Sequence, residues 1–507
     1  MYRANYHRLP QGFADDGLHT GACTVEDGRW VRILRRKGVG RARLARMIRL
    51  IACLFIVTSC AVAQAPDWAK IHAEALEHFT ALIKIDTSNP PGNETKAAEY
   101  VKAVLAREGI ESQLLGPNKD RLNLVARIKG NGSRKPILIM GHTDVVGVQK
   151  EKWTVDPFGG LRKDGFIYGR GSLDDKDNLT ACLMTMILLK RMKAQLDRDV
   201  IFVAEAGEEG FAPEGMRHLV EKQWPEIEAE FALAEGGGGF TRGGEATVVS
   251  VAATEKIGAG VTLVARGPAG HGSVPVLGNA IARLARAVAR VTEWQAPMKL
   301  NDVTRAYFER LASVSPPEKA KVYRDILDPK TAPAAEEYLR VNEPGLNSVL
   351  RTGISPTIIQ GGFRGNVIPS EARATLDIRA LPDEDLPRFY EMLRSVIGDP
   401  AVEIETRGRR ETPPPSRLDT EMFRALERAQ KTVYPKAITV PAMLTGGTDM
   451  QPLRLKGVPS YGVGPLREEG AATNGAHSDD ERIGEAAFYK FVEFLWTAVI
   501  EVAGSKR

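Results

Sequence analysis

Short apolar runs alternate with amphipathic stretches through the first half of the chain. Apolar residues recur at helical spacing in residues 67–85 and 97–108, and again after Asp177, which predicts three helices. Short apolar runs between turn residues predict buried strands at 122–128, 136–140, 200–204 and 231–234. Because strands alternate with helices, we expect an α/β layer built on a mixed, largely parallel sheet.

The pattern changes after the glycine run at 236–239. Residues 253–266 alternate like one long strand, and residues 278–293 follow a helical pattern. Residues 296–345 form a polar, helix-rich insertion that contains six prolines. Further elements are predicted at 357–361, 371–379, 384–397 and 402–406. Together they give a β-α-β-β-α-β order, which is typical of a small two-layer α+β module.

The last part of the chain returns to the first pattern, with a helix at 420–433, a strand at 461–463 and a helix at 485–503. The sequence therefore predicts a main α/β domain interrupted by a smaller α+β module, which we call the lid. The expected boundaries are 66–250 and 414–507 for the main domain, and 251–413 for the lid with its insertion at 296–345.

Residues 1–65 are predicted to be an export signal behind a non-native extension that ends before Met47. A short positive region precedes the apolar stretch 50–57, which is too short to span a bilayer comfortably, and Ala-Gln-Ala at 63–65 resembles a signal-peptidase site. Val-Thr-Ser-Cys60 resembles a lipoprotein box instead, in which Cys60 would carry a lipid anchor. An uncleaved single-pass anchor is the third alternative. Cleavage predicts a periplasmic or secreted protein whose mature chain has no membrane span.

The basic charge balance belongs to this N-terminal segment. Residues 1–49 hold eleven Lys and Arg against four Asp and Glu, a surplus that exceeds the net charge of +5 for the whole chain. The remainder is slightly acidic, so nucleic-acid binding is not expected. Of four cysteines only Cys182 would survive cleavage after Ala65, which excludes a disulfide framework and a Cys-rich zinc motif in the mature chain. Any metal would use His and carboxylate ligands.

Candidate ligands directly follow the predicted strands. His142 follows one apolar run, Glu208 and Glu209 follow a second, and Glu235 follows a third. In sheets of this kind, sites form beyond the carboxyl ends of the strands. Each residue also has an ordinary explanation: a structural histidine, a solvated acidic turn, a helix cap. Their joint position at strand ends favours a site.

Two histidines and three carboxylates suit two metal ions that share one bridging carboxylate, with one glutamate left to handle a proton. The remaining members are Asp174, in a glycine-rich turn before a helix, and His477, near the C-terminus. Asp144 lies two positions after His142 and can accept from its second ring nitrogen, which would fix the tautomer. We assign Glu209 as a ligand and Glu208 as general base and then acid. This inventory predicts a metal-assisted hydrolase.

Seven motifs carry a resemblance to a known family: HTDVV, GRGSLDDK, EAGEEG, AEGGG, GPAGHGSVP, GGFRGNVIP and GAHSDDE. In this order, from about residue 67 onward, the chain resembles the M20 family of di-zinc metallopeptidases. The resemblance implies that His142 and Glu235 bind one zinc ion, that Glu209 and His477 bind the other, and that Asp174 bridges them. Glu208 would be the base, and the peptide between Asp174 and Asp175 is often cis in the family.

The resemblance extends to the lid. His271 resembles the family's lid histidine, which stabilises the developing oxyanion and in dimeric members does so across the subunit boundary. Asn366 and Arg379 resemble the groups that hold the substrate carboxylate, although Arg379 could instead form a salt bridge within the lid. Thr448 and the neighbouring Asp449 match positions that line the substrate pocket. A homodimer is therefore one expected assembly, unless the insertion covers the shared edge.

The chain also departs from the family pattern. Asp177 stands where the family often has glycine, and the insertion at 296–345 points to the long members that resemble carboxypeptidase S and the secreted N-acyl-amino-acid hydrolases. We expect an exported di-zinc hydrolase that cleaves a peptide or N-acyl bond beside a free carboxylate, with small peptides or N-acyl amino acids as substrates. A deacylase of N-acyl amino acids on the same fold is the alternative, and a non-catalytic binding protein the remote one. Cobalt or manganese would suit similar ligands.

Overall fold

The computed structural model describes residues 65–210, 212–406, 411–468 and 475–505. The predicted export signal, the lipoprotein cysteine Cys60 and the extension before Met47 lie outside the described residues. Everything from Pro66 onward belongs to one unit. Among the described residues, no helix combines the length and apolarity needed to cross a membrane.

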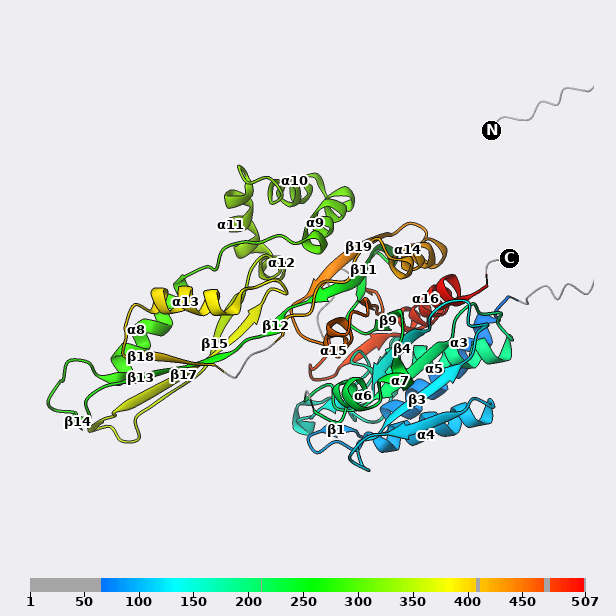
Figure 1. The fold of residues 1–507 in the computed structure, drawn as a ribbon, viewed down its shortest axis with the longest axis horizontal. Coiled ribbons are helices and arrows are strands. Elements are labelled where there is room, and N and C mark those ends of the chain that lie inside the picture. Colours follow the sequence, from blue (N-terminus) through cyan, green and yellow to red (C-terminus); the bar gives the residue numbers. More distant parts are fainter. Residues whose placement is uncertain (1–64, 211, 407–410, 469–474, 506–507) are drawn as a thin grey trace, which may run out of the picture. The chain divides into compact units, whose positions relative to one another are not determined.

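A ten-stranded mixed sheet forms the centre of the main domain (Figure 1). Its spatial order is β2 (Ser112–Leu115), β3 (Asn123–Ile128), β8 (Val200–Glu205), β4 (Ile137–His142), β9 (Phe231–Ala234), β20 (Ser460–Gly462), β11 (Glu245–Glu255), β10 (Gly238–Arg242) and β21 (Arg467–Glu468), with β19 (Ile438–Leu444) beside β11. The central neighbours β8, β4, β9 and β20 are parallel, whereas β2 and β3 pair antiparallel. The predicted mixed, largely parallel sheet is confirmed.

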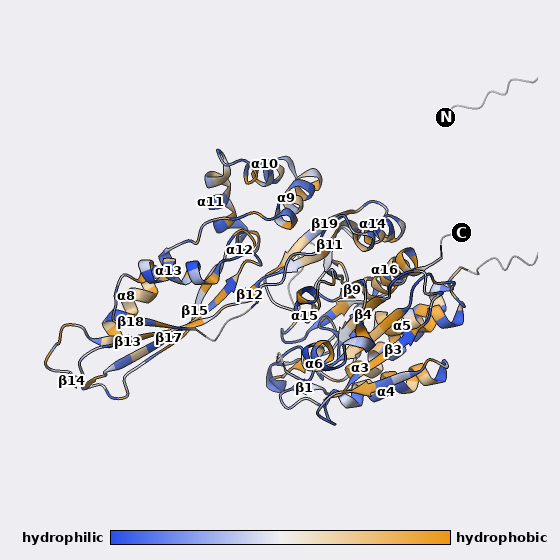
Figure 2. Ribbon diagram, viewed as in Figure 1, coloured by the Kyte–Doolittle hydropathy of each residue, from blue (hydrophilic) through white to orange (hydrophobic). Residues whose placement is uncertain are grey.

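Two separate apolar cores cover the two faces of this sheet. Ile137 and Ile139 belong to one core and Leu138 and Met140 to the other, because successive side chains of a strand point to opposite faces. The larger core contains α3 (Trp68–Ile83), α4 (Thr95–Arg107), α5 (Lys176–Arg191), α14 (Glu421–Val433) and α16 (Glu485–Ala503). The smaller contains residues of α6 (Met216–Lys222), α7 (Trp224–Ile227) and α15 (Met450–Leu455). Figure 2 shows the apolar residues concentrated in β4 and α5, so burial on both faces holds the strand ends in place.

A second sheet of five strands forms the lid. Its strands are β12 (Ile257–Gly258), β17 (Glu371–Ala380), β13 (Val261–Arg266) and β18 (Val402–Thr406), with β15 (Gly353–Gly361) paired to β17. Residues of α8 (Ala280–Glu293) and α13 (Leu386–Ile397) share its core. The insertion forms α9 (Asp302–Val314), α10 (Pro317–Asp325), α11 (Ala332–Asn342) and α12 (Pro344–Ser348) around a small core of its own.

Short elements complete the described fold: β1 (Ser88–Asn89) with β5 (Val145–Val146), β14 (Gly270–His271) with β16 (Val367–Ile368), the sheet of β22 (Arg482–Gly484), β7 (Phe166–Tyr168) and β6 (Leu161–Lys163), and a 3-10 turn at Lys150–Lys152.

The single long strand expected at 253–266 is wrong. β11 stays in the large sheet as far as Glu255, and β12 and β13 belong to the lid sheet. Lys256 lies at the change of sheet, and its N–H donates to the carbonyl of Leu444 on β19. Alternation continues through this crossing because each strand is half-buried in its own sheet, so the pattern alone does not reveal the break.

Candidate metal centre

The candidate ligands stand where neighbouring parallel strands end. β4 ends at His142, which is in register with Glu205, the last residue of β8. Glu208 and Glu209 follow in the next turn, and Glu235 directly follows β9. Because the carboxyl ends of these strands meet at one edge of the sheet, the side chains converge there.

Asp174 stands between the two histidines. Its Oδ1 lies 2.9 Å from Nε2 of His142, and its Oδ2 lies 3.1 Å from Nε2 of His477. Nε2 of His477 is also 3.0 Å from Oε1 of Glu209. Two groups of potential ligand atoms result, His142–Asp174–Glu235 and Asp174–Glu209–His477, with the atoms of each group within 4.8 Å of one another. The structure thus brings together all five sequence-predicted ligands, with Asp174 common to both groups.

The charges of this cluster suit divalent cations. Burial and the neighbouring Asp174 and Glu208 raise the pKa of Glu235 well above its ordinary value. Burial also opposes ionisation of Asp174, but hydrogen bonds to His142 and His477 hold its pKa well below the usual range. Crowded carboxylates of this kind repel one another unless a cation lies among them. Two imidazoles and three carboxylates are ligands that zinc, cobalt and manganese accept, so the donor set fits two such ions.

The turn that carries Asp174 leads directly into α5. The peptide between Asp174 and Asp175 is cis, as the resemblance implies. Asp175 occupies the N-cap position of α5, so Asp174 is not the cap of that helix. The Oδ2 of Asp175 instead accepts from the N–H of His142 at 3.2 Å and from Nδ2 of Asn178 at 2.9 Å. Asp175 therefore joins the end of β4 to the start of α5.

With this geometry established, comparisons with known proteins decide the family. Residues 138–501, more than half of the chain, match the model of Peptidase family M20/M25/M40. The chain belongs to this peptidase family. It is therefore an M20 enzyme of the peptidase/amidohydrolase type.

The curated proteins that are similar to this chain include one named a synthase/hydrolase and one named a desuccinylase. An N-fatty-acyl-amino acid synthase/hydrolase of Homo sapiens is 26% identical over 443 residues, which cover 84% of this chain and 86% of that protein. A sequence of Staphylococcus aureus named probable succinyl-diaminopimelate desuccinylase is 29% identical over 329 residues, covering 64% and 73%.

Solved M20 structures share the fold. A metallo-carboxypeptidase of Sulfolobus solfataricus has a TM-score of 0.65 at 21% identity and covers 85% of this chain and 99% of its own. A Bacillus subtilis protein described as a dinuclear metal binding peptidase from the M20 family has a TM-score of 0.54 at 17% identity and covers 86% and 99%.

Asp144 organises the turn that carries both glutamates of the M20 site. Its Oδ1 accepts from the N–H of Glu208 and its Oδ2 from the N–H of Glu209, each at 3.1 Å. Nδ2 of Asn89 donates to Oδ2 at 2.9 Å. The expected bond to His142 is different in detail: Nδ1 lies 2.9 Å from the backbone carbonyl of Asp144 and 3.5 Å from its carboxylate. The backbone carbonyl of Asp144 is thus the nearer acceptor for His142, and the carboxylate accepts from three N–H donors.

A buried ion pair that the sequence analysis missed joins the two loops of the site. Nη1 of Arg170 lies 2.5 Å from Oε2 of Glu481, and both residues are buried. Oε1 of Glu481 accepts from the N–H of Leu173 at 2.8 Å, and Nη2 of Arg170 lies 3.5 Å from the carbonyl of His477. The pair thus holds the Asp174 turn against the His477 loop. The sequence held a clue to this ion pair, because Arg170 lies in the motif that contains Asp174 and Glu481 lies in the motif that contains His477.

The predicted lid residues form two groups, which lie apart from the two ligand groups: His271 with Asn366, and Arg379. His271 and Asn366 come together because β14 pairs with β16, and the N–H of Gly272 donates to the carbonyl of Asn366 at 2.8 Å. His271 is exposed and its Nδ1 lies 2.6 Å from Oγ of Ser273. Arg379 on β17 pairs with Asp377 at 3.1 Å. The salt bridge that the sequence analysis kept as an alternative is therefore present.

Arg379 also lines a cavity of about 430 Å³. Gly447 and Gln451, on either side of Thr448, line the same cavity. Thr448 itself is buried, and its hydroxyl donates to Glu255 at 2.6 Å. The bond to Glu255 thus anchors the segment that contains Gly447 and Gln451, and it already uses the hydrogen of the Thr448 hydroxyl.

Proposed function

We propose that this M20 enzyme is an exported di-zinc hydrolase that cleaves a peptide or N-acyl amide bond beside a free carboxylate. The observation that carries the proposal is the pair of ligand groups that share Asp174, with Glu208 in the adjacent turn. Bound zinc ions would supply Lewis acidity, which polarises the amide carbonyl and lowers the pKa of a water.

Glu208 is suited to move the proton. It is 8% exposed, and burial raises its pKa well above the ordinary value, with His142 opposing and Asp449 and Glu209 adding to the rise. A carboxylate with a raised pKa accepts a proton from the attacking water and returns it to the leaving amine more readily than an ordinary one. Asp144 fixes the backbone of Glu208, so the carboxylate approaches from a defined direction.

The lid supplies the remaining roles. Arg379 and Asn366 hold the substrate carboxylate, since a guanidinium donates two parallel bonds to a carboxylate, and His271 stabilises the developing oxyanion. Because Arg379 lies apart from His271 and Asn366 within one lid, the last two would come from the lid of the second chain in a homodimer. Thr448 contributes to the pocket wall. Closure of the lid, residues 251–413, over the main domain would complete the site and exclude water.

Deacylation of N-acyl amino acids is the second candidate. Two curated relatives support it, since their names specify an N-fatty-acyl-amino acid and a succinyl amide. Peptidases and deacylases of this kind break the same bond, and they differ in what lies on the acyl side.

A homodimer through the lid is part of the proposal. Among the described strands β15 pairs with β17 alone, and its Ile358 and Ile359 are 53% and 63% exposed. An exposed apolar strand edge is a natural place for a second chain to pair. Sedimentation equilibrium measures the assembly, and a monomer at micromolar concentration would contradict it.

One experiment tests the central proposal. The protein purified after expression with its own N-terminus is analysed for bound metals and for its N-terminal residue, which distinguishes cleavage at Ala65, acylation at Cys60 and an uncleaved chain. The zinc-loaded protein is then assayed against dipeptides, N-acetyl amino acids and N-fatty-acyl amino acids. About two zinc ions per chain and turnover of at least one class support the function, whereas metal-free protein or no turnover across the panel contradicts it.

A further inference from the structure

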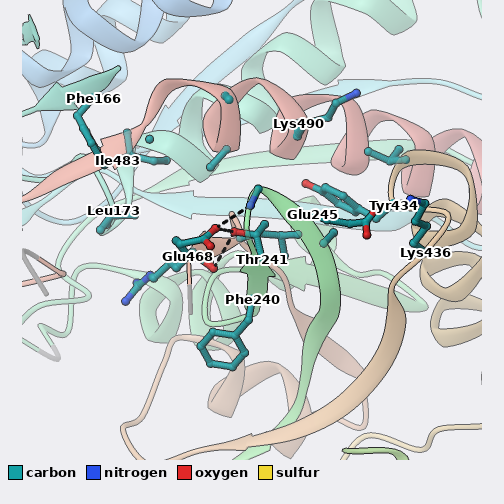
Figure 3. A pocket seen from close by; sticks show the side chains of 18 of the residues that line it. Phe166, Leu173, Phe240, Thr241, Glu245, Tyr434, Lys436, Glu468, Ile483 and Lys490 are labelled. Carbon is teal, nitrogen blue, oxygen red and sulfur yellow. Dashed lines mark hydrogen bonds and ion pairs between the residues drawn. The ribbon is translucent and has the colours of Figure 1, made fainter. Parts of the chain in front are cut away.

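A large cavity in the main domain is lined by residues that neighbour two candidate metal ligands in the sequence (Figure 3). Its volume is about 930 Å³, near the upper end of the range for small-molecule sites. Walls come from α16, β10, β22 and the segment after α14. Phe166, Leu173, Ala246, Leu466, Ile483 and Ala487 are among the apolar residues that line it.

Most of the charged side chains around this cavity already have a partner within the protein. Lys436 pairs with Glu245, Lys490 lies 2.7 Å from Glu493, and the carboxylate of Glu468 accepts from the N–H of Gly243 at 2.6 Å. An apolar ligand in the cavity would leave these interactions intact, because the charged groups can stay in contact with water at the rim. A ligand with many polar groups would find few unpaired partners here, and each buried polar group left without a partner is costly.

The cavity reaches the backbone that carries the metal ligands. Leu173 lines it and directly precedes Asp174, and Gly475 lines it two residues before His477. Figure 3 shows Leu173 with Phe166 and Ile483 at one end, and Tyr434 with Lys436 at the other. The cavity therefore extends away from the bridging aspartate as an elongated apolar space.

We propose that this cavity binds the long alkyl chain of an N-acyl amino acid, so that the enzyme favours long-chain acyl substrates. The inference rests on the proposed function, because it assigns the acyl side of the same scissile amide. An alkyl chain has no hydrogen-bonding groups to satisfy, whereas a peptide would bring backbone N–H and C=O groups into the apolar space. The carboxylate end of the substrate would lie at the lid, on the other side of the amide.

A chain-length series tests this assignment. The zinc-loaded enzyme is assayed on the N-acetyl, N-octanoyl and N-palmitoyl derivatives of one amino acid. Because each buried methylene strengthens apolar binding, we expect kcat/KM to rise by about tenfold or more from the shortest to the longest chain. A flat or falling series, with N-acetyl turnover intact, would overturn the cavity assignment while the proposed function stands.

Two variants fill the cavity from different elements that line it. Ala487→Trp on α16 and Ala246→Phe on β11 should each lower the ratio of palmitoyl to acetyl turnover by about tenfold. Ala103→Trp, the same substitution at an exposed position of α4, is the matched control and should keep the wild-type ratio. If both cavity variants fold, as near-UV circular dichroism would report, and both keep that ratio, the assignment is wrong.

Binding is measured separately from turnover, with palmitate displacing a polarity-sensitive fluorescent fatty acid. Palmitate should bind, compete with the N-acyl substrate and bind at least about tenfold more weakly to Ala487→Trp. Palmitate that binds without competing would overturn the role as a subsite. Binding that appears only after removal of residues 1–65 would overturn it as well, and would assign the cavity to the apolar stretch 50–57. If palmitate binds but the enzyme hydrolyses no amide substrate, the proposed function is contradicted, whereas the cavity is still supported as an alkyl-binding site.

Discussion

The carboxylate of Asp144 accepts the backbone N–H of Glu208 at 3.1 Å. The same residue holds His142 through its backbone carbonyl and Glu209 through its second carboxylate oxygen. Burial opposes ionisation of Asp144, but His142, Asn89 and Glu209 together lower its pKa below the ordinary value. A charged, fully buried aspartate thus connects a ligand of one metal group, a ligand of the other and the proposed base.

Replacing Asp144 with asparagine should loosen the turn that carries Glu208 and Glu209, while the backbone carbonyl that holds His142 remains. One carboxylate oxygen becomes an NH₂ group, which cannot accept from the N–H of Glu208 or Glu209. We expect zinc affinity and kcat/KM to fall by about ten- to a hundredfold, as is usual for groups that orient metal ligands. Competition with a chromophoric chelator measures the affinity. Asp164→Asn, in an exposed turn, is the control, and equal affinities for the two variants would refute the role of Asp144.

Glu208→Gln should separate metal binding from catalysis. Glutamine has nearly the same shape but cannot take a proton, so kcat should fall by about 10²- to 10⁴-fold. The zinc content should stay near that of the wild type because the ligand groups are intact. Single-turnover kinetics and atomic absorption measure the two quantities. Undiminished turnover at normal zinc content would remove Glu208 from the mechanism.

Glu481→Gln should destabilise the protein through its partner. The change keeps an acceptor for the N–H of Leu173 but leaves buried Arg170 without a counter-charge. Breaking a buried pair in this way costs about 3–5 kcal/mol of unfolding free energy, which urea denaturation measures. Zinc affinity should fall too, because the His477 loop loses its anchor. Asp419→Asn is the control, because it removes the exposed partner of Arg417 and should change neither the unfolding free energy nor the zinc affinity. If Asp419→Asn lowers both as much as Glu481→Gln does, the effect is not specific to the buried pair.

Glu255 should make stability depend on pH. Burial raises its pKa from 4.5 to about 7, despite the opposing effects of Arg454 and Thr448. Since the folded pKa lies above the unfolded one, the stabilising contribution is complete below about pH 4.5 and is lost as the pH rises through 7. The unfolding free energy of the wild type should therefore decline from pH 5 to pH 8, by on the order of 2 kcal/mol relative to Glu255→Gln. Parallel profiles for the two proteins would contradict this account.

Removal of the metal should lower stability as well as activity. Without cations the carboxylates of Asp174, Glu209 and Glu235 repel one another. At metal concentrations of 100 to 1,000 times Kd, binding adds about 3–4 kcal/mol to the unfolding free energy. Chelation should therefore lower the melting temperature, and zinc, cobalt or manganese should restore it. A melting temperature that is the same with chelator and with zinc would argue against a metal centre formed by these residues.

Where the sequence predicted elements well, the signal was local. The observed β9 and α16 have the expected bounds, and α3 begins within one residue of its expected start. The spacing of apolar residues in these elements follows the face that is buried, so the helical or strand period is clear in the sequence. β19 was missed because Pro441 interrupts its apolar run. Proline is tolerated there because, within the part of the chain that the structure describes, β19 pairs with β11 alone and is an edge strand.

The sequence by itself determined the residue types of the site and their position after buried strands, because chain continuity fixes which residues come next after each strand. Only the tertiary structure decided that His142 and His477, 335 positions apart by their numbers, each lie at one oxygen of Asp174. It also decided that Arg170 pairs with Glu481, and that an apolar cavity opens behind Leu173. Distances between segments far apart in the chain depend on how whole elements pack, and no local pattern of residues encodes that packing.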